Sequence, residues 1–164
     1  MTRLLRNRWV ALIAALALGG FFIAASWHKI EDPPDFAKAV FNFKLVPWQA
    51  INATAIYLPW FELLAGLAVL TGLGRRGGAF AIAALLCVFI AAIGFNLYRG
   101  HPTVCGCFET YESARNLTPE VKFWKMKKEI LLDTGLLLLA ACVIYASFAR
   151  SREPEDVRLP GSPA

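Results

Sequence analysis

Charged side chains are scarce in this sequence. Only 18% of its 164 residues are charged, whereas 57% are hydrophobic, and the mean hydropathy is +0.51. Water-soluble globular domains carry about 25% charged residues and a smaller apolar fraction. The shortage of charge therefore excludes a soluble single domain.

Long uncharged runs hold the apolar excess. They cover residues 9–28, 45–74, 77–98 and 130–149, and the second and fourth contain one acidic residue each, Glu62 and Asp133. A membrane-spanning helix needs about 20 apolar residues. We therefore predict an all-α polytopic membrane protein, a bundle of four transmembrane helices at about 9–29, 56–73, 79–97 and 127–149.

Prolines and polar segments set the remaining boundaries. Pro47 and Pro59 divide the second run, which predicts a short amphipathic or re-entrant helix over 47–57 before the spanning part. Residues 98–120 are expected to form a polar loop. The tail 150–164, with three prolines and mixed charges, is expected to be disordered. Residues 1–149 then make one membrane domain.

Basic residues lie at the ends of the apolar runs. The 17 lysines and arginines give a net charge of +5 but gather on no single face, which excludes nucleic acid as a partner and favours the lipid bilayer. Arg3, Arg6 and Arg8 precede the first run, which is longer than the apolar part of a usual secretory signal and is expected to stay uncleaved. These arginines and the pair at 75–76 favour cytoplasmic termini, although four lysines between 122 and 128 lie on the opposite side.

Cysteine is also rare, with four residues, and two of them stand close together. Cys105 and Cys107 flank Gly106 in the polar loop, which the favoured topology places outside the cytoplasm, in an oxidising compartment. A disulfide between them would close a small, strained ring, and strained disulfides are readily reduced. The pair indicates thiol–disulfide exchange. The alternative is two inert cysteines in a buried loop, or two that bond elsewhere.

The other two cysteines, Cys87 and Cys142, fall inside the third and fourth predicted helices at similar depth. They could meet there. Isolated thiols in apolar surroundings are usually inert packing residues, and we expect Cys87 and Cys142 to be of this kind.

Histidine is limited to two residues, which restricts metal binding. The best group of ligand types is His101 with Cys105 and Cys107, and with His28 or Glu109 as the fourth. Zinc ligands are typically spaced by two to four residues, and this spacing fits poorly. We expect no metal site and interfacial hydrogen bonds for each histidine.

Three charged residues lie in or beside the predicted spans, where charge is costly and usually functional. They are Lys29, Glu62 and Asp133. At about 1.5 Å per residue, Lys29 and Asp133 approach the outer boundary and could pair, whereas Glu62 lies near the midplane. Glu62 is then either protonated, or within reach of Lys29 if the second helix starts lower. A structural role and a redox or proton role both remain open for Glu62.

Several short segments occur in an order typical of one membrane-protein family. They are 27–33 (WHKIEDP), 36–40 (FAKAV), 45–47 (LVP), 58–63 (LPWFEL) with Gly66, and 105–108 (CGCF). Over about residues 8–148 the chain resembles MauE/DoxX-type redox-associated membrane proteins, and the cysteine motif is typical of the methylamine-utilisation protein MauE branch. The resemblance implies a DoxX-like four-helix bundle in the bacterial inner membrane.

The resemblance also implies a function. In methylamine metabolism such proteins are thought to assist maturation of the disulfide-rich small subunit of methylamine dehydrogenase, with a periplasmic thioredoxin-like partner. Cys105 and Cys107 would be the redox pair, and the supporting residues would be Lys29, Glu62, Asp133, His101 and Glu109. Glu109 departs from the glycine usual in the family, and its carboxylate disfavours a neighbouring thiolate.

Two other functions remain open. A quinone-dependent thiol oxidase of the DsbB or vitamin K epoxide reductase kind needs relayed cysteine pairs, and only one close pair exists unless Cys87 and Cys142 form a second. A non-catalytic membrane anchor or subunit of a quinone-linked oxidoreductase, as among DoxX relatives, needs no thiols. Quinone is the cofactor that these alternatives introduce.

Overall fold

Long helices make up most of the structure, a computed structural model that describes residues 8–103 and 116–149. Within these ranges there is no strand. The helices long and apolar enough to cross a membrane are α2 (Arg8–Glu31), α4 (Trp48–Thr71), α5 (Arg75–Tyr98) and α7 (Pro119–Ala149). A shorter helix, α3 (Pro33–Phe43), follows α2. The protein is therefore an all-α, multi-pass membrane protein built as a four-helix bundle, as the sequence predicts.

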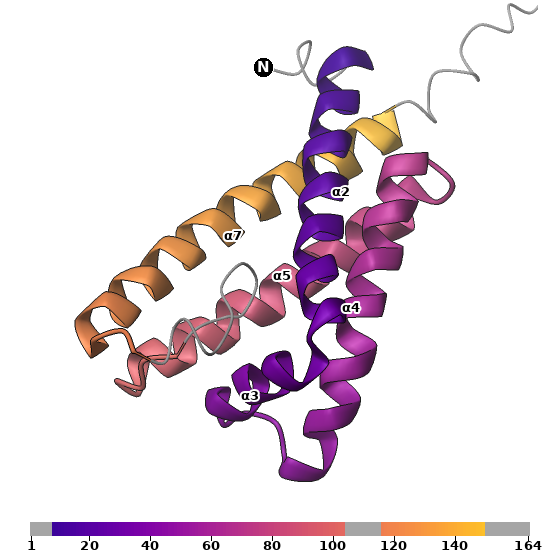
Figure 1. Ribbon diagram of the computed structural model, residues 1–164. Helices are drawn as coiled ribbons and strands as arrows, with labels where there is room; N and C mark the ends of the chain where they lie inside the picture. The colour runs from indigo at the N-terminus through magenta and orange to yellow at the C-terminus, as the bar shows by residue number, and fades with distance from the viewer. Residues whose placement is uncertain (1–7, 104–115, 150–164) are drawn as a thin grey trace, which may run out of the picture.

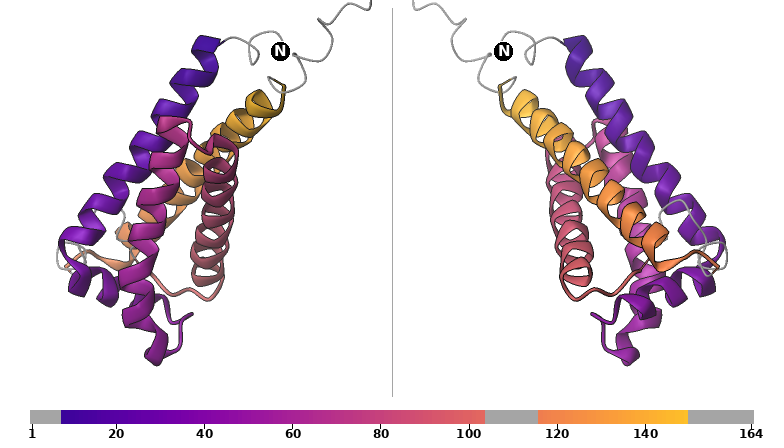
Figure 2. Two further views of the ribbon diagram at one scale, coloured as in Figure 1. Left: turned by 90° about the vertical axis from the view of Figure 1, so that its right-hand side faces the viewer. Right: turned by 90° about the vertical axis from the view of Figure 1, so that its left-hand side faces the viewer.

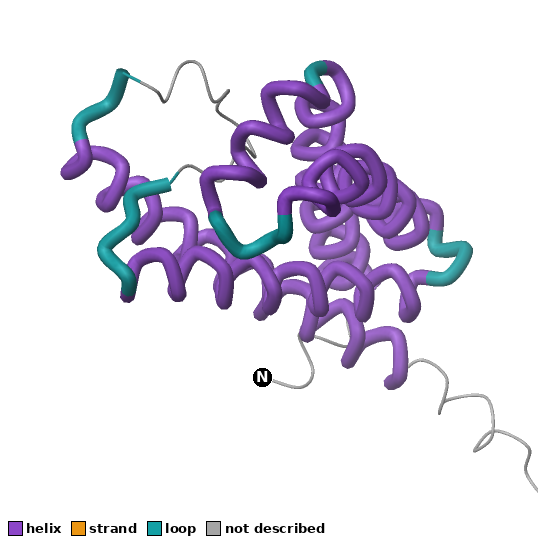
Figure 3. Tube along the Cα trace, turned by 90° about the horizontal axis from the view of Figure 1, so that it is seen from below, coloured by secondary structure: helices purple, strands orange, loops and turns teal. Residues whose placement is uncertain are grey.

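The long helices form two packed pairs. α2 lies along α4, and α5 lies along α7, as both views of Figure 2 show. α2 and α5 end, and α4 and α7 begin, toward the lower side of Figure 1, where α3 also lies. We call this side the loop end; Figure 3 views it from below. The chain leaves the described part at Thr103 and re-enters it at Asn116, both at the loop end.

Small residues allow α2 and α4 to approach closely. A Cβ atom added to Gly19 would lie 2.9 Å from the carbonyl oxygen of Gly66, and one added to Gly66 would lie 3.1 Å from that of Gly19. Membrane helix pairs use small residues in this way, since backbone contact replaces the hydrophobic effect as the driving force. The core draws on all four long helices, and its buried members include Leu18, Val69, Ile82 and Val143.

The outward faces of the helices are apolar. Large side chains such as Leu64, Leu131 and Leu138 are 63%, 74% and 66% exposed. Such surfaces match the hydrocarbon of a bilayer, where the backbone hydrogen bonds are satisfied inside each helix. The exposed leucines are therefore lipid-facing residues rather than an unfilled core.

α4 is one continuous helix, which differs from the break expected at its prolines. It begins directly after Pro47 and contains Pro59. A proline removes one backbone hydrogen bond and presses against the carbonyl four residues earlier. Membrane helices tolerate this because apolar surroundings favour all the remaining hydrogen bonds. The helix expected over 47–57 is therefore the first half of α4 and not a separate element.

α3 lies between the first two predicted spans, in a stretch where no helix is expected from the sequence. The side chain of Asp32 accepts a hydrogen bond from the backbone N–H of Asp35 at 3.1 Å and so caps the helix. Prolines stand in the first turn, where no N–H is needed. The helix buries one face, which includes Phe36, Ala39 and Val40. α3 therefore closes one side of the loop end.

Two spanning helices begin earlier than expected. α5 begins at Arg75 rather than near 79, because Gly72 and Gly74, with φ of 82° and 115°, complete the turn within a few residues. α7 begins at Pro119 rather than near 127, so its lysine-rich first turns are helical. Residues 104–115 and the tail 150–164 lie outside the described residues, and the disordered tail stays a prediction.

Candidate functional site

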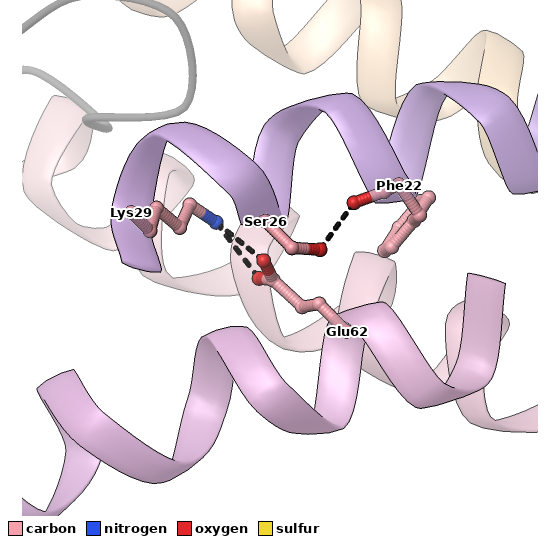
Figure 4. Close-up of polar contacts among 4 residues, drawn as sticks. All are labelled: Phe22, Ser26, Lys29 and Glu62. Carbon is pink, nitrogen blue, oxygen red and sulfur yellow. Dashed lines mark hydrogen bonds and ion pairs between the residues drawn. The ribbon is translucent and has the colours of Figure 1, made fainter. Parts of the chain in front are cut away.

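A buried ion pair joins α2 to α4 near the loop end. Nζ of Lys29 lies 2.8 Å from each of the two carboxylate oxygens of Glu62. The residues are 3% and 1% exposed. Figure 4 shows the two side chains pointing toward one another from their helices. The sequence leaves two alternatives for Glu62, a protonated side chain or one within reach of Lys29. In the structure Glu62 contacts Lys29.

The lean of the two side chains brings them together. Side chains on a helix tilt toward its N-terminus. α2 and α4 run in opposite directions, so Lys29 leans back along α2 while Glu62 leans toward the loop end. The flexible stem of Lys29 spans the remaining gap. Counting rise per residue from the helix ends ignores both leans. It also assumes that the ends of α2 and α4 opposite the loop end lie level, whereas Gly19, 11 residues into α2, packs on Gly66, five residues before the end of α4. For both reasons it places the two charges at different depths.

Aromatic and polar groups surround the ion pair. Nζ of Lys29 lies 5.1 Å from the ring centroid of Phe36 and 5.3 Å from that of Phe89, within cation–π range. Ser26, one turn earlier on α2, is buried, and its hydroxyl donates to the carbonyl of Phe22 (Figure 4). The charge of Lys29 is thus enclosed by groups from four elements, and the ion pair fixes α2 against α4.

A second set of contacts ties the loop end together around Asn96 of α5, which is fully buried. Its side-chain N–H donates to the carbonyl of Phe43 at 3.1 Å, and its side-chain oxygen accepts from Arg99 at 3.2 Å. The backbone N–H of Thr103 contacts the sulfur of Met126 at 3.5 Å, and both residues are buried. The end of α3, the end of α5 and the chain up to Thr103 are therefore held against the bundle.

Asp133 approaches the ion pair from α7. It is half-buried, and its carboxylate interacts electrostatically with Lys29. The direct 2.8 Å ion pair of Lys29 is nevertheless made with Glu62, so the pairing expected between Lys29 and Asp133 is a longer-range interaction. The direct ion pair of Lys29 therefore joins α2 to α4.

Other candidates lie apart from the ion pair. His101 is half-buried, and its backbone N–H donates to the carbonyl of Asn96 at 2.9 Å; His28 is exposed on the last turn of α2. Cys87 and Cys142 are free thiols, and Cys87 is exposed on α5. These two cysteines do not form a second disulfide in this structure.

The loop cysteines lie outside the described residues. Cys105, Cys107 and Glu109 belong to residues 104–115, so the redox pair stays a prediction. Within the described ranges, no group of three or more His, Cys, Asp or Glu side chains could hold a metal ion. The group of possible ligands around His101 includes residues outside the described ranges. The expectation that this group binds no metal therefore also stays a prediction.

Sequence reasoning missed two aromatic residues around the site, Phe36 and Phe89, and the partners of a third residue, Asn96. Asn96 carried a signal, since it is a polar residue inside an apolar run, and buried amides need partners. Phe36 and Phe89 carried none, because an aromatic residue beside a cation cannot be told from a core aromatic without the contact.

Comparisons with known proteins match most of this chain. The family model described as Methylamine utilisation protein MauE matches residues 7–147. The chain is 32% identical to methylamine utilization protein MauE of Paracoccus denitrificans over 142 residues, or 86% of this chain and 72% of that protein. It is 33% identical to the protein of the same name from Paracoccus versutus over 79% of this chain and 67% of the relative. No solved structure matches the chain.

The match to a further relative covers a shorter part of the chain. The chain is 33% identical to methylamine utilization protein MauE of Methylophilus methylotrophus over 108 residues, 65% of this chain and 57% of that protein. The family match itself runs from the start of α2 almost to the end of α7 and includes the ion pair. It confirms the resemblance drawn from the short motifs. The chain therefore belongs to the methylamine utilisation protein MauE family.

Proposed function

We propose that this protein exchanges disulfides with proteins outside the cytoplasm, through Cys105 and Cys107. The partner is a periplasmic thioredoxin-like protein, and the client is a protein that matures by disulfide formation, such as the methylamine dehydrogenase small subunit. The site of action is the outer face of the bacterial inner membrane, with both termini in the cytoplasm. The family supports a role in methylamine utilisation, because its relatives carry that name.

The anchored loop end is the observation that carries the proposal. The chain is held against α7 as far as Thr103, and it returns at Asn116 just before α7 begins. A thiol pair that must meet a partner protein benefits from a rigid scaffold, because less conformational freedom is lost on docking. The ion pair and the contacts of Asn96 supply that rigidity at the same end.

The chemistry is a balanced two-step exchange. A thiolate of one cysteine attacks a disulfide of the partner, which forms a mixed disulfide and releases one partner thiolate. The second cysteine then attacks the mixed bond, so Cys105 and Cys107 become oxidised and the partner is reduced to a dithiol. The reverse sequence oxidises the partner. In either direction two electrons pass, and the protons of two thiols pass with them.

Single-cysteine variants test this proposal. Cys105→Ala and Cys107→Ala should each be expressed, since removal of the resolving thiol stops the reaction at the mixed disulfide. We expect one of them to give an adduct with a thioredoxin-like protein on non-reducing gels, which reductant removes. Cys87→Ala and Cys142→Ala are the controls and should give none. If neither loop variant forms an adduct and the double variant still supports client maturation, the protein acts without thiol exchange.

A further inference from the structure

An open hollow lies at the end of the bundle opposite the loop end, where α4 ends, α5 begins and α7 ends (Figure 1). Its volume is about 640 Å³, and its lining comes from the turn between α4 and α5, the first residues of α5 and Ser147 of α7. The ends of spanning helices lie at the level of the lipid headgroups. The hollow is therefore at the membrane–water interface, between the two helix pairs.

Two arginine side chains supply the charge of the hollow, and the surrounding helices fix their positions. Nε of Arg75 donates to the carbonyl of Val69 at 3.3 Å, and its guanidinium lies against Gly72, where an added Cβ would be 3.3 Å from Nη2. Nη2 of Arg76 donates to the carbonyl of Ser147 at 2.8 Å. Both carbonyls are in the last turn of a helix, where the helix itself supplies no N–H donor. The two cations are thus held in place without a ligand.

Both arginines keep hydrogen-bond donors for a ligand. A guanidinium has five N–H donors, and within the described part of the chain Arg75 and Arg76 each use one. Neither forms an ion pair with a carboxylate of the described residues, and none of the described lining residues is acidic. Phosphate oxygens match the planar fork of a guanidinium and accept two N–H groups from it. The hollow therefore suits a phosphate group.

Apolar side chains beside the hollow favour a lipid phosphate over a soluble one. Leu73, which lines the hollow, is 87% exposed, and Phe80 and Phe148 are 51% and 47% exposed. The guanidinium of Arg76 lies 4.8 Å from the ring centroid of Phe148, and that ring meets Phe80 edge-on with centroids 6.3 Å apart. The cations are thus continuous with the lipid-facing sides of α5 and α7, along which acyl chains would lie.

The two positive charges also select among lipid headgroups. A zwitterionic headgroup such as phosphatidylcholine brings a cationic amine, which two guanidiniums repel and for which the described lining offers no carboxylate. Phosphatidylglycerol carries the same phosphate with an uncharged glycerol. Basic pockets between spanning helices bind anionic headgroups for this reason.

We infer that the hollow binds the phosphate of one anionic phospholipid, such as phosphatidylglycerol, between Arg75 and Arg76. The bound lipid contacts the α4–α5 turn and the end of α7, so it ties the two helix pairs together at the end opposite the loop end. Binding needs neither Cys105 nor Cys107, and this site stands apart from the proposed thiol exchange.

Native mass spectrometry of the full chain tests the site. The chain is released from nanodiscs that contain equal amounts of phosphatidylglycerol and phosphatidylcholine with the same acyl chains, and the lipids that stay bound are identified by mass. We expect one phosphatidylglycerol to be retained about tenfold or more over phosphatidylcholine, as the attraction of two arginines predicts. Equal retention of the two lipids would overturn the site.

Two double variants with the same loss of charge show where the lipid binds. Arg75→Gln/Arg76→Gln removes both guanidiniums of the hollow, and Arg3→Gln/Arg6→Gln removes two arginines that precede α2. We expect the preference for phosphatidylglycerol to be lost almost completely in the first variant and kept in the second. An equal loss in both would show a general attraction of basic residues to anionic lipid, and would contradict a site in the hollow.

Two measurements on the unaltered chain decide the matter even where the variant does not fold. Glycerol 3-phosphate, which has the phosphate without acyl chains, should not displace the lipid in large excess; displacement would mean that the hollow takes a soluble phosphate instead. Phosphatidylglycerol with a photoreactive group near its phosphate should label the peptides that hold the α4–α5 turn and the end of α7. Labels spread evenly over the helices would overturn the site.

Discussion

The Lys29–Glu62 ion pair sets, at the scale of single residues, how the first two spanning helices meet. Both charges are almost fully buried, and each carboxylate oxygen lies 2.8 Å from the ammonium. Removing one member of such a pair leaves an uncompensated buried charge, whereas replacing both with apolar residues is often tolerated. Apolar substitutions of Lys29 and of Glu62 should therefore have strongly non-additive effects on the free energy of unfolding.

Lys29→Met alone should lower the free energy of unfolding by about 3–5 kcal/mol. The double variant Lys29→Met/Glu62→Met should recover most of that loss, because no unpaired charge remains. Unfolding of the full chain in detergent measures both. The control is Lys38→Met, since Lys38 lies 4.0 Å from Asp35 with its side chain 49% exposed, and it should cost only about 0–1 kcal/mol. A double variant as unstable as the single one would contradict a direct pair.

The residues of this pair could be found from the sequence, but their partnership could not. A charge inside or beside an apolar run is conspicuous, and both Lys29 and Glu62 stand out in that way. Their contact depends on the lean of two side chains and on where α4 begins, and neither follows from residue spacing. Asn96 was visible for the same reason as Glu62, yet its partner is a carbonyl 53 residues earlier in the chain.

Among the elements, α2 and α4 are a pair whose contact depends on residue size. Gly19 faces the backbone of Gly66, whereas Gly20, its neighbour, has no atom within 4 Å of an added Cβ. The two glycines are adjacent on one helix, so they share the same backbone and differ in what they face.

Gly19→Ala should destabilise the protein by about 1–3 kcal/mol, because its Cβ would meet a backbone oxygen that cannot move without the helix. Gly20→Ala should be neutral or stabilising by up to about 1 kcal/mol, since alanine favours a helix. Thermal unfolding of the two variants in the same detergent compares them directly. Equal melting temperatures would mean that α2 and α4 do not touch at Gly19.

The elements show where local patterns are sufficient and where they fail. The cap at Asp32, the prolines after it and the spacing of Phe36, Ala39 and Val40 are together a helix signature, although no helix is predicted there from the sequence. Pro59 predicts a break in the second span, but the structure has none. In water an interior proline ends most helices, but apolar surroundings favour every hydrogen bond that remains, so α4 continues through it.

At the scale of the whole molecule, the thickness of the bilayer allows the number of spanning helices to be predicted from the sequence. A spanning helix needs about 20 apolar residues, so four uncharged runs were enough to predict four spans. The arrangement of the two helix pairs depends on small-residue contacts and on buried charges, which hydropathy does not report. Residues 104–115, which hold the proposed redox pair, are outside the described residues, and the described chain stops at Thr103 and resumes at Asn116, both at the loop end.

The most direct test of the account asks whether Cys105 and Cys107 form a disulfide outside the cytoplasm. Intact cells carrying the full chain with Cys87→Ser and Cys142→Ser are treated with a membrane-impermeant polymer-linked maleimide, before and after mild reduction, and the mass shift is read on a gel. We predict no shift before reduction and a shift of two labels after it, without lysis. A shift that appears only after lysis would place the loop in the cytoplasm and would contradict the exchange of disulfides proposed for this protein. Two labels before reduction would contradict the oxidised resting pair predicted here.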